Sequence, residues 1–183
     1  MPVNPVAENV LGTIGTVLWC IQIIPQIIKN QRDRSTYGLS SYLFLIWAYA
    51  SVPEGAYLLI EWVNIPLIVQ PQIFAALALI AVGQCMYFRD GGSTIGSRFS
   101  LKQTIAACVG MAVLAGGVEL AMFELGRLGK RHGTDAASQV FGIIGVIGIL
   151  AGLFPQFYEI WKMKEVVGKS PCCLCCSNPC NES

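Results

Sequence analysis

Charged residues are scarce in this chain, and their scarcity excludes whole classes of protein. Only 13% of the 183 residues are Asp, Glu, Lys or Arg, whereas 54% are hydrophobic, and the mean hydropathy is +0.58. A typical soluble domain carries about twice that share of charge. The few charges lie in short clusters between apolar runs and give a net charge of +1, which leaves no basic face for nucleic acid. We therefore expect a small polytopic membrane protein.

The residue sets that enzymes need are also missing. The single histidine, His132, lies in a loop segment, no serine stands in a nucleophile elbow, and no pair of carboxylates is spaced for acid–base chemistry. We therefore expect a protein that is not an enzyme and that has no cofactor and no metal ion. His132 could titrate in an acidic compartment, but a lone loop histidine is more often simply solvated.

Apolar runs of about 20 residues, which is long enough to cross roughly 30 Å of hydrocarbon, occur five times. No Lys or Arg precedes the first run, so the basic start of a cleavable signal peptide is missing and we expect the first helix to stay in the mature protein. The predicted spans cover residues 7–28, 39–62, 66–88, 101–123 and 137–161.

An internal repeat is the most informative feature. Ile24-Pro25-Gln26-Ile27 returns 130 residues later (25 to 155) as Phe154-Pro155-Gln156-Phe157. Laid over each other without a gap, the two regions also pair Gly12 with Gly142, Gly15 with Gly145, Arg32 with Lys162, Arg34 with Lys164, and Gly38-x-Ser40 with Gly168-x-Ser170. An apolar span and its exit loop have therefore been duplicated.

These residues resemble the PQ-loop repeat family of membrane proteins, whose members include cystinosin and the vacuolar or lysosomal exporters of cationic amino acids. The resemblance implies an all-α, SWEET-like helical bundle of seven spans, arranged as three plus one plus three. It also implies proton-linked export of a small solute, often an amino acid, from the vacuole or lysosome. By position, Pro25 and Gln26 would form the first hinge of such a transporter, and Pro155 and Gln156 the second.

Five spans fall short of the seven that the resemblance implies, so the chain looks like a C-terminally truncated member. We expect residues 1–90 to form the first three-helix bundle and residues 91–130 to hold the linker helix and loops. Residues 131–170 would begin the second repeat with one helix, and residues 171–183 would form a Cys-rich tail. Transport by a monomer is then doubtful, and a homo-oligomer could complete the path.

Polar side chains inside apolar spans mark candidate sites, because a carboxylate in hydrocarbon is costly. Glu54 follows Pro53 in the second span, and Glu119 lies toward the end of the fourth. Proline removes a backbone donor and favours a kink or a polar cavity. The candidate substrate or proton site therefore comprises Glu54, Asn64 and Gln72, although Glu54 could instead be hydrated near the luminal interface.

Small residues recur at the four-residue spacing of a helix face. In lipid such residues allow close helix packing, and we expect packing faces at these positions with no further role. The pairs are Gly12 with Thr16, Ala112 with Gly116, and Gly148 with Gly152.

The cationic residues predict an orientation. Counted on alternate sides of the spans, nine Lys and Arg residues fall on one face and three on the other. The three are Arg127, Lys130 and Arg131, in the predicted fourth loop. The bias predicts a luminal N-terminus and a cytosolic C-terminus, and the family resemblance points to the vacuolar or lysosomal membrane.

Cysteine occurs in two groups. Cys20, Cys85 and Cys108 stand singly in apolar spans, where we expect small hydrophobic side chains. The remaining five crowd the tail, which could come from an alternative transcript with no selected role. It could also be S-palmitoylated, whereas a zinc site is the weakest interpretation. The candidate palmitoylation sites are Cys172, Cys173, Cys175 and Cys176.

Two functions remain open from the sequence. The first is a transporter, or a fragment of one, whose partners are the lipid bilayer, a small solute and protons. The alternative is a membrane receptor or scaffold that does not transport, or a regulatory truncated isoform. Loss of proton-dependent uptake on Pro25→Leu or Glu54→Gln would favour the transporter.

Overall fold

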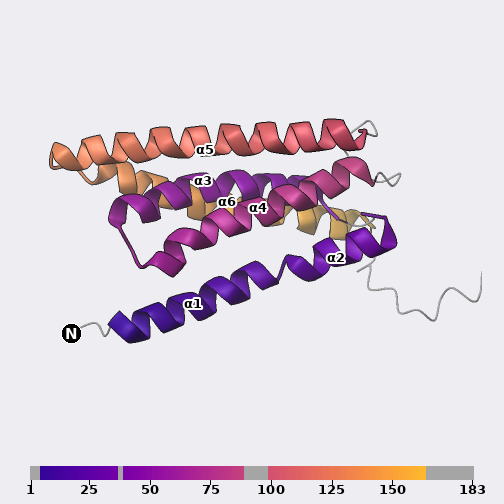
Figure 1. Ribbon diagram of the computed structural model, residues 1–183, viewed down its shortest axis with the longest axis horizontal. Coiled ribbons are helices and arrows are strands. Elements are labelled where there is room, and N and C mark those ends of the chain that lie inside the picture. Colours follow the sequence, from indigo (N-terminus) through magenta and orange to yellow (C-terminus); the bar gives the residue numbers. More distant parts are fainter. Residues whose placement is uncertain (1–4, 37–38, 89–98, 164–183) are drawn as a thin grey trace, which may run out of the picture.

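The described part of the computed structural model comprises residues 5–36, 39–88 and 99–163, and within these ranges the chain is helical with no strand (Figure 1). The prediction of an all-α protein is confirmed. The elements are α1 (Pro5–Ile21), α2 (Ile24–Asp33), α3 (Ser41–Glu61), α4 (Ile65–Tyr87), α5 (Leu101–Arg131) and α6 (Ala136–Met163).

Within the described residues, five helical stretches are long and apolar enough to cross a membrane, as the hydropathy pattern predicts. The first of them, Asn9–Asp33, joins most of α1 to α2, the next three coincide with α3, α4 and α5, and the fifth, Ala136–Pro155, is the first part of α6. Their exposed surfaces are rich in large apolar side chains, which suits helices whose outer faces meet lipid. The protein is an integral membrane protein.

The first span is broken just before its proline. α1 ends at Ile21, α2 begins at Ile24, and Pro25 lies in the first turn of α2, where its missing N–H is tolerated. Pro53, Pro71 and Pro155 instead lie inside continuous helices. Of the prolines that could mark a kink, only Pro25 coincides with an interruption in the described helices.

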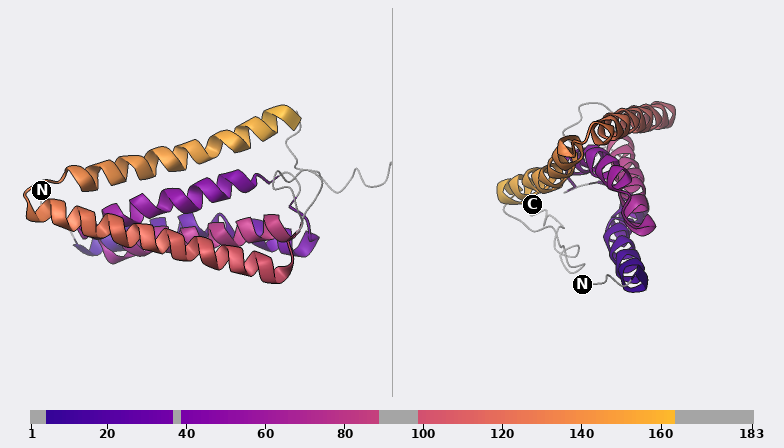
Figure 2. Two further views of the ribbon diagram at one scale, coloured as in Figure 1. Left: turned by 90° about the horizontal axis from the view of Figure 1, so that it is seen from above. Right: turned by 90° about the vertical axis from the view of Figure 1, so that its left-hand side faces the viewer.

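α4 lies between α1 and α3 and packs on both, and α5 packs against α3 and α4. Phe74 of α4 is fully buried and contacts two indoles, with ring centroids 5.6 Å from Trp19 of α1 and 5.5 Å from Trp47 of α3. Seen along the bundle, α1 and α6 stand apart (Figure 2, right), and they make no contact.

α6 packs along α3 through a row of four glycines. A methyl group added to Gly145 would lie 2.9 Å from Cβ of Glu54, and one added to Gly148 would lie 2.7 Å from Cβ of Ala50. Gly142 and Gly152 approach Tyr57 and Trp47 in the same way. In addition, the Trp47 indole donates to the carbonyl of Ile149 over 3.0 Å. The absence of side chains on one face of α6 thus sets the α3–α6 distance.

The predicted packing faces have different outcomes. Gly148 and Gly152 do pack closely, against Ala50 and Trp47, and Gly12 lies against the side chain of Asn64. Gly116 of α5 has no atom within 4 Å of an added methyl group, so the prediction of close packing at that position is wrong.

The fourth span is longer than its apolar run. The prediction placed its end at residue 123 and put Arg127, Lys130 and Arg131 in a loop, but α5 continues as a helix through Arg131. Side-chain pairs support the extra turns, because Arg127 bonds Glu124 at 3.2 Å and Lys130 bonds Glu61 of α3 at 2.9 Å. Only His132 to Asp135 remain to connect α5 with α6, and Gly133 (φ 74°) makes the reversal.

Candidate functional site

Glu54 lies on the face of α3 that meets α6, and it lines a cavity of about 540 Å³ between these two helices. The side chain is partly buried, and its Cβ lies against Gly145 in the glycine row. Tyr57 and Gln139 bring further polar groups to a lining that is otherwise mostly aliphatic. A few polar groups in an apolar concavity are the usual makeup of a small-molecule site.

Gln72 belongs to α4 and does not line the cavity at Glu54. It lies where α4 meets α5, close to α3. Its amide nitrogen donates to the carboxylate of Glu119, and both side chains line a second cavity of about 150 Å³. This pair lies close to Gly55 of α3, where an added methyl group would lie 2.5 Å from Oε1 of Glu119 and 2.8 Å from Nε2 of Gln72. The structure therefore brings Gln72 together with Glu119 and not with Glu54.

Asn64 caps a helix. Its side-chain oxygen accepts a hydrogen bond from the backbone N–H of Leu67 at 3.3 Å, at the first turn of α4, and the same side chain lies 3.1 Å from where a methyl group on Gly12 would be. Asparagine is a favoured residue at this position. The predicted trio of Glu54, Asn64 and Gln72 is thus spread over three places.

The glutamine of the first PQ motif belongs to a chain of amides between α2 and α4. Gln26 Nε2 donates to Asn30 Oδ1 (2.8 Å), Asn30 Nδ2 donates to Gln84 Oε1 (3.1 Å), and Gln84 Nε2 donates to the carbonyl of Ile27 (3.0 Å). Asn30 is only 2% exposed. These contacts fasten α2 to α4 directly after the break in the first span.

Sequence reasoning missed Gln84 and Asn30. Gln84 is a polar residue near the end of an otherwise apolar span, which is the same signal that marked Gln72. Asn30 lies in the polar stretch after the first apolar run, where nothing distinguishes it from its neighbours.

A further polar contact fastens α1 to α4. The hydroxyl of Thr16 lies 3.0 Å from the carbonyl of Pro66 and 3.3 Å from Oε1 of Gln70, and also 2.9 Å from the carbonyl of Gly12 in its own helix. α1 thus contacts α4 through Thr16, whereas α2 contacts α4 through the amide chain of Asn30 and Gln84.

Several predicted residues cannot be placed in a site. Pro155 lies inside α6, and the side chain of Gln156 is outside what the structure describes. Cys172, Cys173, Cys175 and Cys176 lie outside the described residues as well. The hinge and palmitoylation roles of these residues stay predictions.

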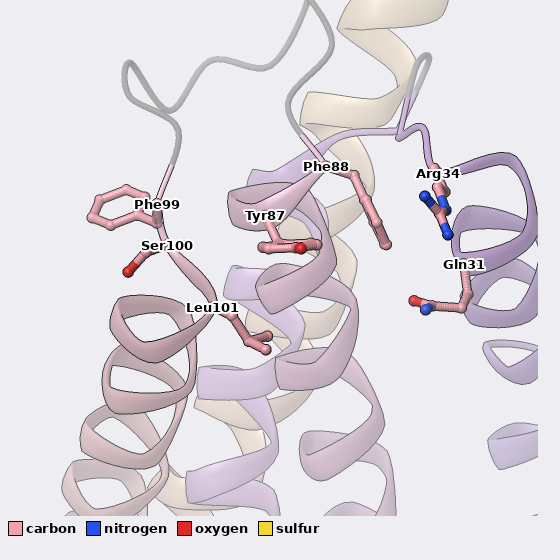
Figure 3. A pocket seen from close by; sticks show the side chains of 7 residues that line it. All are labelled: Gln31, Arg34, Tyr87, Phe88, Phe99, Ser100 and Leu101. Atoms are coloured by element: carbon pink, nitrogen blue, oxygen red, sulfur yellow. The ribbon is translucent and has the colours of Figure 1, made fainter.

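A larger cavity, of about 610 Å³, lies at the end of the bundle where α4 ends and α5 begins (Figure 3). Gln31 and Arg34 lie on one side of it, and Phe99, Ser100 and Leu101 on the other. Arg34 is the one charged side chain in its described lining. None of the residues predicted for the substrate or proton site contributes to it.

Cysteine and metal chemistry have little support in the described ranges. Cys20 and Cys85 are buried and Cys108 is partly buried, and within the described ranges none of the three forms a disulfide, in keeping with small hydrophobic side chains. No three His, Cys, Asp or Glu residues of the described ranges are grouped so that they could hold a metal ion.

The described residues form five apolar helical spans, with Glu54 and Glu119 inside two of them and amide contacts between them, and these features define a polytopic helical membrane protein. The chain belongs to the PQ-loop repeat family, whose model matches residues 7–67 and 137–181. The first matched segment contains Pro25-Gln26, and the second contains Pro155-Gln156. The duplication predicted from the sequence is therefore confirmed as a repeat of this family.

The curated relatives carry no assigned function. An uncharacterized protein of Schizosaccharomyces pombe is 34% identical over 91% of this chain and 56% of its own length. An uncharacterized membrane protein of Saccharomyces cerevisiae is 29% identical over 88% of this chain and 51% of its own length. The chain thus spans about half the length of these relatives. No solved structure matches it.

Proposed function

We propose that the protein is a transporter, or part of one, that exports a small solute of the amino-acid class from the vacuole or lysosome with proton coupling. The family supports this class of function, since the resemblance to cystinosin and to exporters of cationic amino acids implies proton-linked movement of small solutes. The solute, the coupling and the compartment are all parts of the proposal.

The position of Glu54 is the observation on which the proposal depends. It is a partly buried carboxylate within a membrane span, and it lines a cavity of about 540 Å³ together with Tyr57 and Gln139. A carboxylate in such a place attracts the ammonium group of a cationic or zwitterionic solute. Because α3 and α6 belong to different repeats, a relative movement of the two bundles would change access to Glu54.

The break at Pro25 supplies a place for such movement. α2 is joined to α1 by only two non-helical residues, Gln22 and Ile23, whereas the amides of Asn30 and Gln84 hold α2 to α4. We propose that α1 tilts at this break while α2 stays docked on α4. Pro155 would serve as the corresponding hinge in α6.

The charges at the two ends of the bundle support a luminal N-terminus. Lys29, Arg32, Arg34 and Lys102 lie at the end where α2 ends and α5 begins, and Lys130 at the other end is paired with Glu61 (Figure 1). Because Lys130 is paired with an acidic side chain, it counts less against a luminal position of this end of the bundle. A pH-sensitive fluorescent protein fused to the N-terminus should report an acidic lumen, and a neutral reading would reverse the orientation.

Flux through the purified protein tests the proposal. We would reconstitute the 183-residue chain in liposomes, impose a pH gradient and follow a mixture of basic and neutral amino acids. We expect uptake above that of empty liposomes, and its loss in Glu54→Gln. Glu124→Gln is the matched control, because Glu124 is an exposed carboxylate on α5 that pairs only with its neighbour Arg127. Binding to a protein partner without any flux would favour a receptor or scaffold instead.

A further inference from the structure

We propose that Glu119 and Gln72 form a proton-binding site in the groove between α4 and α5, separate from the cavity at Glu54. This inference deepens the proposed function, on which its role in coupling rests, because it assigns the proton and the solute to different carboxylates. The site itself can be tested without any flux.

Three helices meet at this point, and each contributes one element of the site. Gln72 comes from α4, Glu119 from α5, and Gly55 from α3 provides the space in which the two side chains meet. Any side chain at position 55 would overlap both polar groups, since even a methyl group would lie 2.5 Å from the carboxylate oxygen. The cavity beside the pair is small, about 150 Å³, which suits a proton and water better than a solute.

Glu119 lies well inside its helix. It is 12 residues, or about three turns, from the end of α5 at Arg131. It is only partly buried by protein, and Gln72 is exposed, so the pair lies at the outer surface of the bundle within a membrane span. A charged carboxylate is expensive in such surroundings, and binding a proton removes the charge.

No cation in the described ranges is paired with this carboxylate. On α5, Arg127 pairs with Glu124 and Lys130 with Glu61, and α4 carries no charged residue along its length. On α3, Glu54 points toward α6 and Glu61 toward Lys130. Glu119 therefore has an amide for its partner, and nothing in contact with it fixes the ionised state.

An amide is a suitable partner for a group that gains and loses a proton. The NH₂ of Gln72 donates to the carboxylate, as observed. When Glu119 takes up one proton to become a neutral carboxylic acid, its new O–H can donate to the carbonyl oxygen of the same amide after the amide rotates. Both states keep a hydrogen bond across α4 and α5, whereas a lysine or arginine partner would hold the ionised state.

Infrared spectroscopy detects the protonated acid directly. We would place the 183-residue chain in lipid nanodiscs and record the C=O stretching band of carboxylic acids while the pH is raised. We expect one component of this band to titrate away in the unsubstituted protein, to be absent in Glu119→Gln, and to persist in Glu54→Gln and Glu124→Gln. In Gln72→Leu the band should remain but shift in frequency, because its hydrogen-bond partner is gone.

A Glu119→Gln spectrum that titrates like that of the unsubstituted protein would overturn the proposal. If Glu119→Gln did not elute as a single species with native helical content, the Gln72→Leu shift would decide alone, and an unshifted band would count against the site. The infrared test can disprove the proton site without testing transport, and the flux test can disprove transport without testing the proton site. A Glu119 band in a protein that moves no amino acid would support the proton site and leave the proposed function without support.

Discussion

At the first Pro-Gln motif, hydrogen bonds between amide side chains connect α2 to α4, whereas an ion pair connects α3 to α5. Gln26, Asn30, Gln84 and the carbonyl of Ile27 form a continuous series of hydrogen bonds, and Asn30 is almost completely buried. Amides can be buried at lower cost than ions, provided that their donors and acceptors are paired. Such a series can hold α2 in place while leaving the neighbouring break free to bend.

Replacing Gln84 tests this fastening. Gln84→Leu leaves the amide of Asn30 and the carbonyl of Ile27 without the partners they have in the structure. We expect the free energy of unfolding to fall by about 1–3 kcal/mol, which is the usual cost of orphaned buried polar groups. Denaturant titration in mild detergent measures it. Gln31→Leu is the matched control, since Gln31 is an exposed glutamine on α2, and an equal loss there would contradict the assignment.

Gly55 makes the Glu119–Gln72 contact possible, and a single methyl group should break it. Gly55→Ala places carbon 2.5 Å from the carboxylate oxygen, so the two side chains must separate. We expect the carboxylic-acid band to shift as it does in Gln72→Leu. Gly117→Ala on α5 meets nothing within 4 Å and should leave the band in place. An unshifted band in Gly55→Ala would mean that the pair does not depend on this space.

Single residues could be picked out from the sequence more reliably than their partners. Glu54 and Gln26 stood out because one is charged in an apolar span and the other is repeated. That Gln72 meets Glu119 could not be foreseen, because 47 residues separate them and helix rotation decides which faces meet. Asn64 looked like a site residue but its polarity serves to cap α4.

At the scale of the helix, equivalent residues of the two repeats have different neighbours. Gly145 of α6 packs against Glu54 of α3, whereas Gly15, its repeat partner in α1, has nothing within 4 Å of an added methyl group. The cause is that α6 packs on α3 while α1 packs on α4. The sequence alignment of the repeats therefore says nothing about which helix each glycine meets.

This contrast supplies a matched pair of variants. Gly145→Leu must push α6 away from α3, and we expect a loss of about 1–3 kcal/mol in the free energy of unfolding, as for other overpacked positions. Gly15→Leu should be close to neutral in the same chain. Thermal unfolding of both variants in detergent makes the comparison. Equal losses at the two positions would show that the α3–α6 distance does not depend on the glycine row.

The helices themselves could be predicted well because hydropathy governs them. The second, third and fifth spans lie within two residues of α3, α4 and α6 at both ends. The first and fourth differ for local reasons. The backbone is interrupted before Pro25, and α5 runs past its apolar run because Glu61 and Glu124 pair with the cations of its last turns. Neither effect is visible in the distribution of apolar residues.

For the molecule as a whole, the exposed apolar face of α1 is the feature that calls for a partner. α1 packs only on α2 and α4, and its large apolar side chains, including Leu11 (69% exposed) and Leu18 (65% exposed), meet no other described part of the chain. Lipid can cover such a face, but a second copy can cover it as well.

We expect self-association of the 183-residue chain on this ground. Mass measurement of the protein in mild detergent or nanodiscs should give a homodimer or a larger closed oligomer. Leu11→Ala together with Leu18→Ala should shift it toward the monomer, while Val113→Ala with Leu114→Ala, at similarly exposed positions on α5, should not. A strictly monomeric, aggregation-prone product would contradict completion of the bundle by association.

Passage of solute by Glu54 with a proton carried alongside it can be measured directly. Amino acids would be added to liposomes that contain the protein and an internal pH indicator, with no pH gradient at the start. We expect a change of internal pH on addition, no solute movement in Glu54→Gln, and solute movement without a pH change in Glu119→Gln. If amino acids moved through the unsubstituted protein with no pH change, or did not move at all, proton-coupled transport would be wrong.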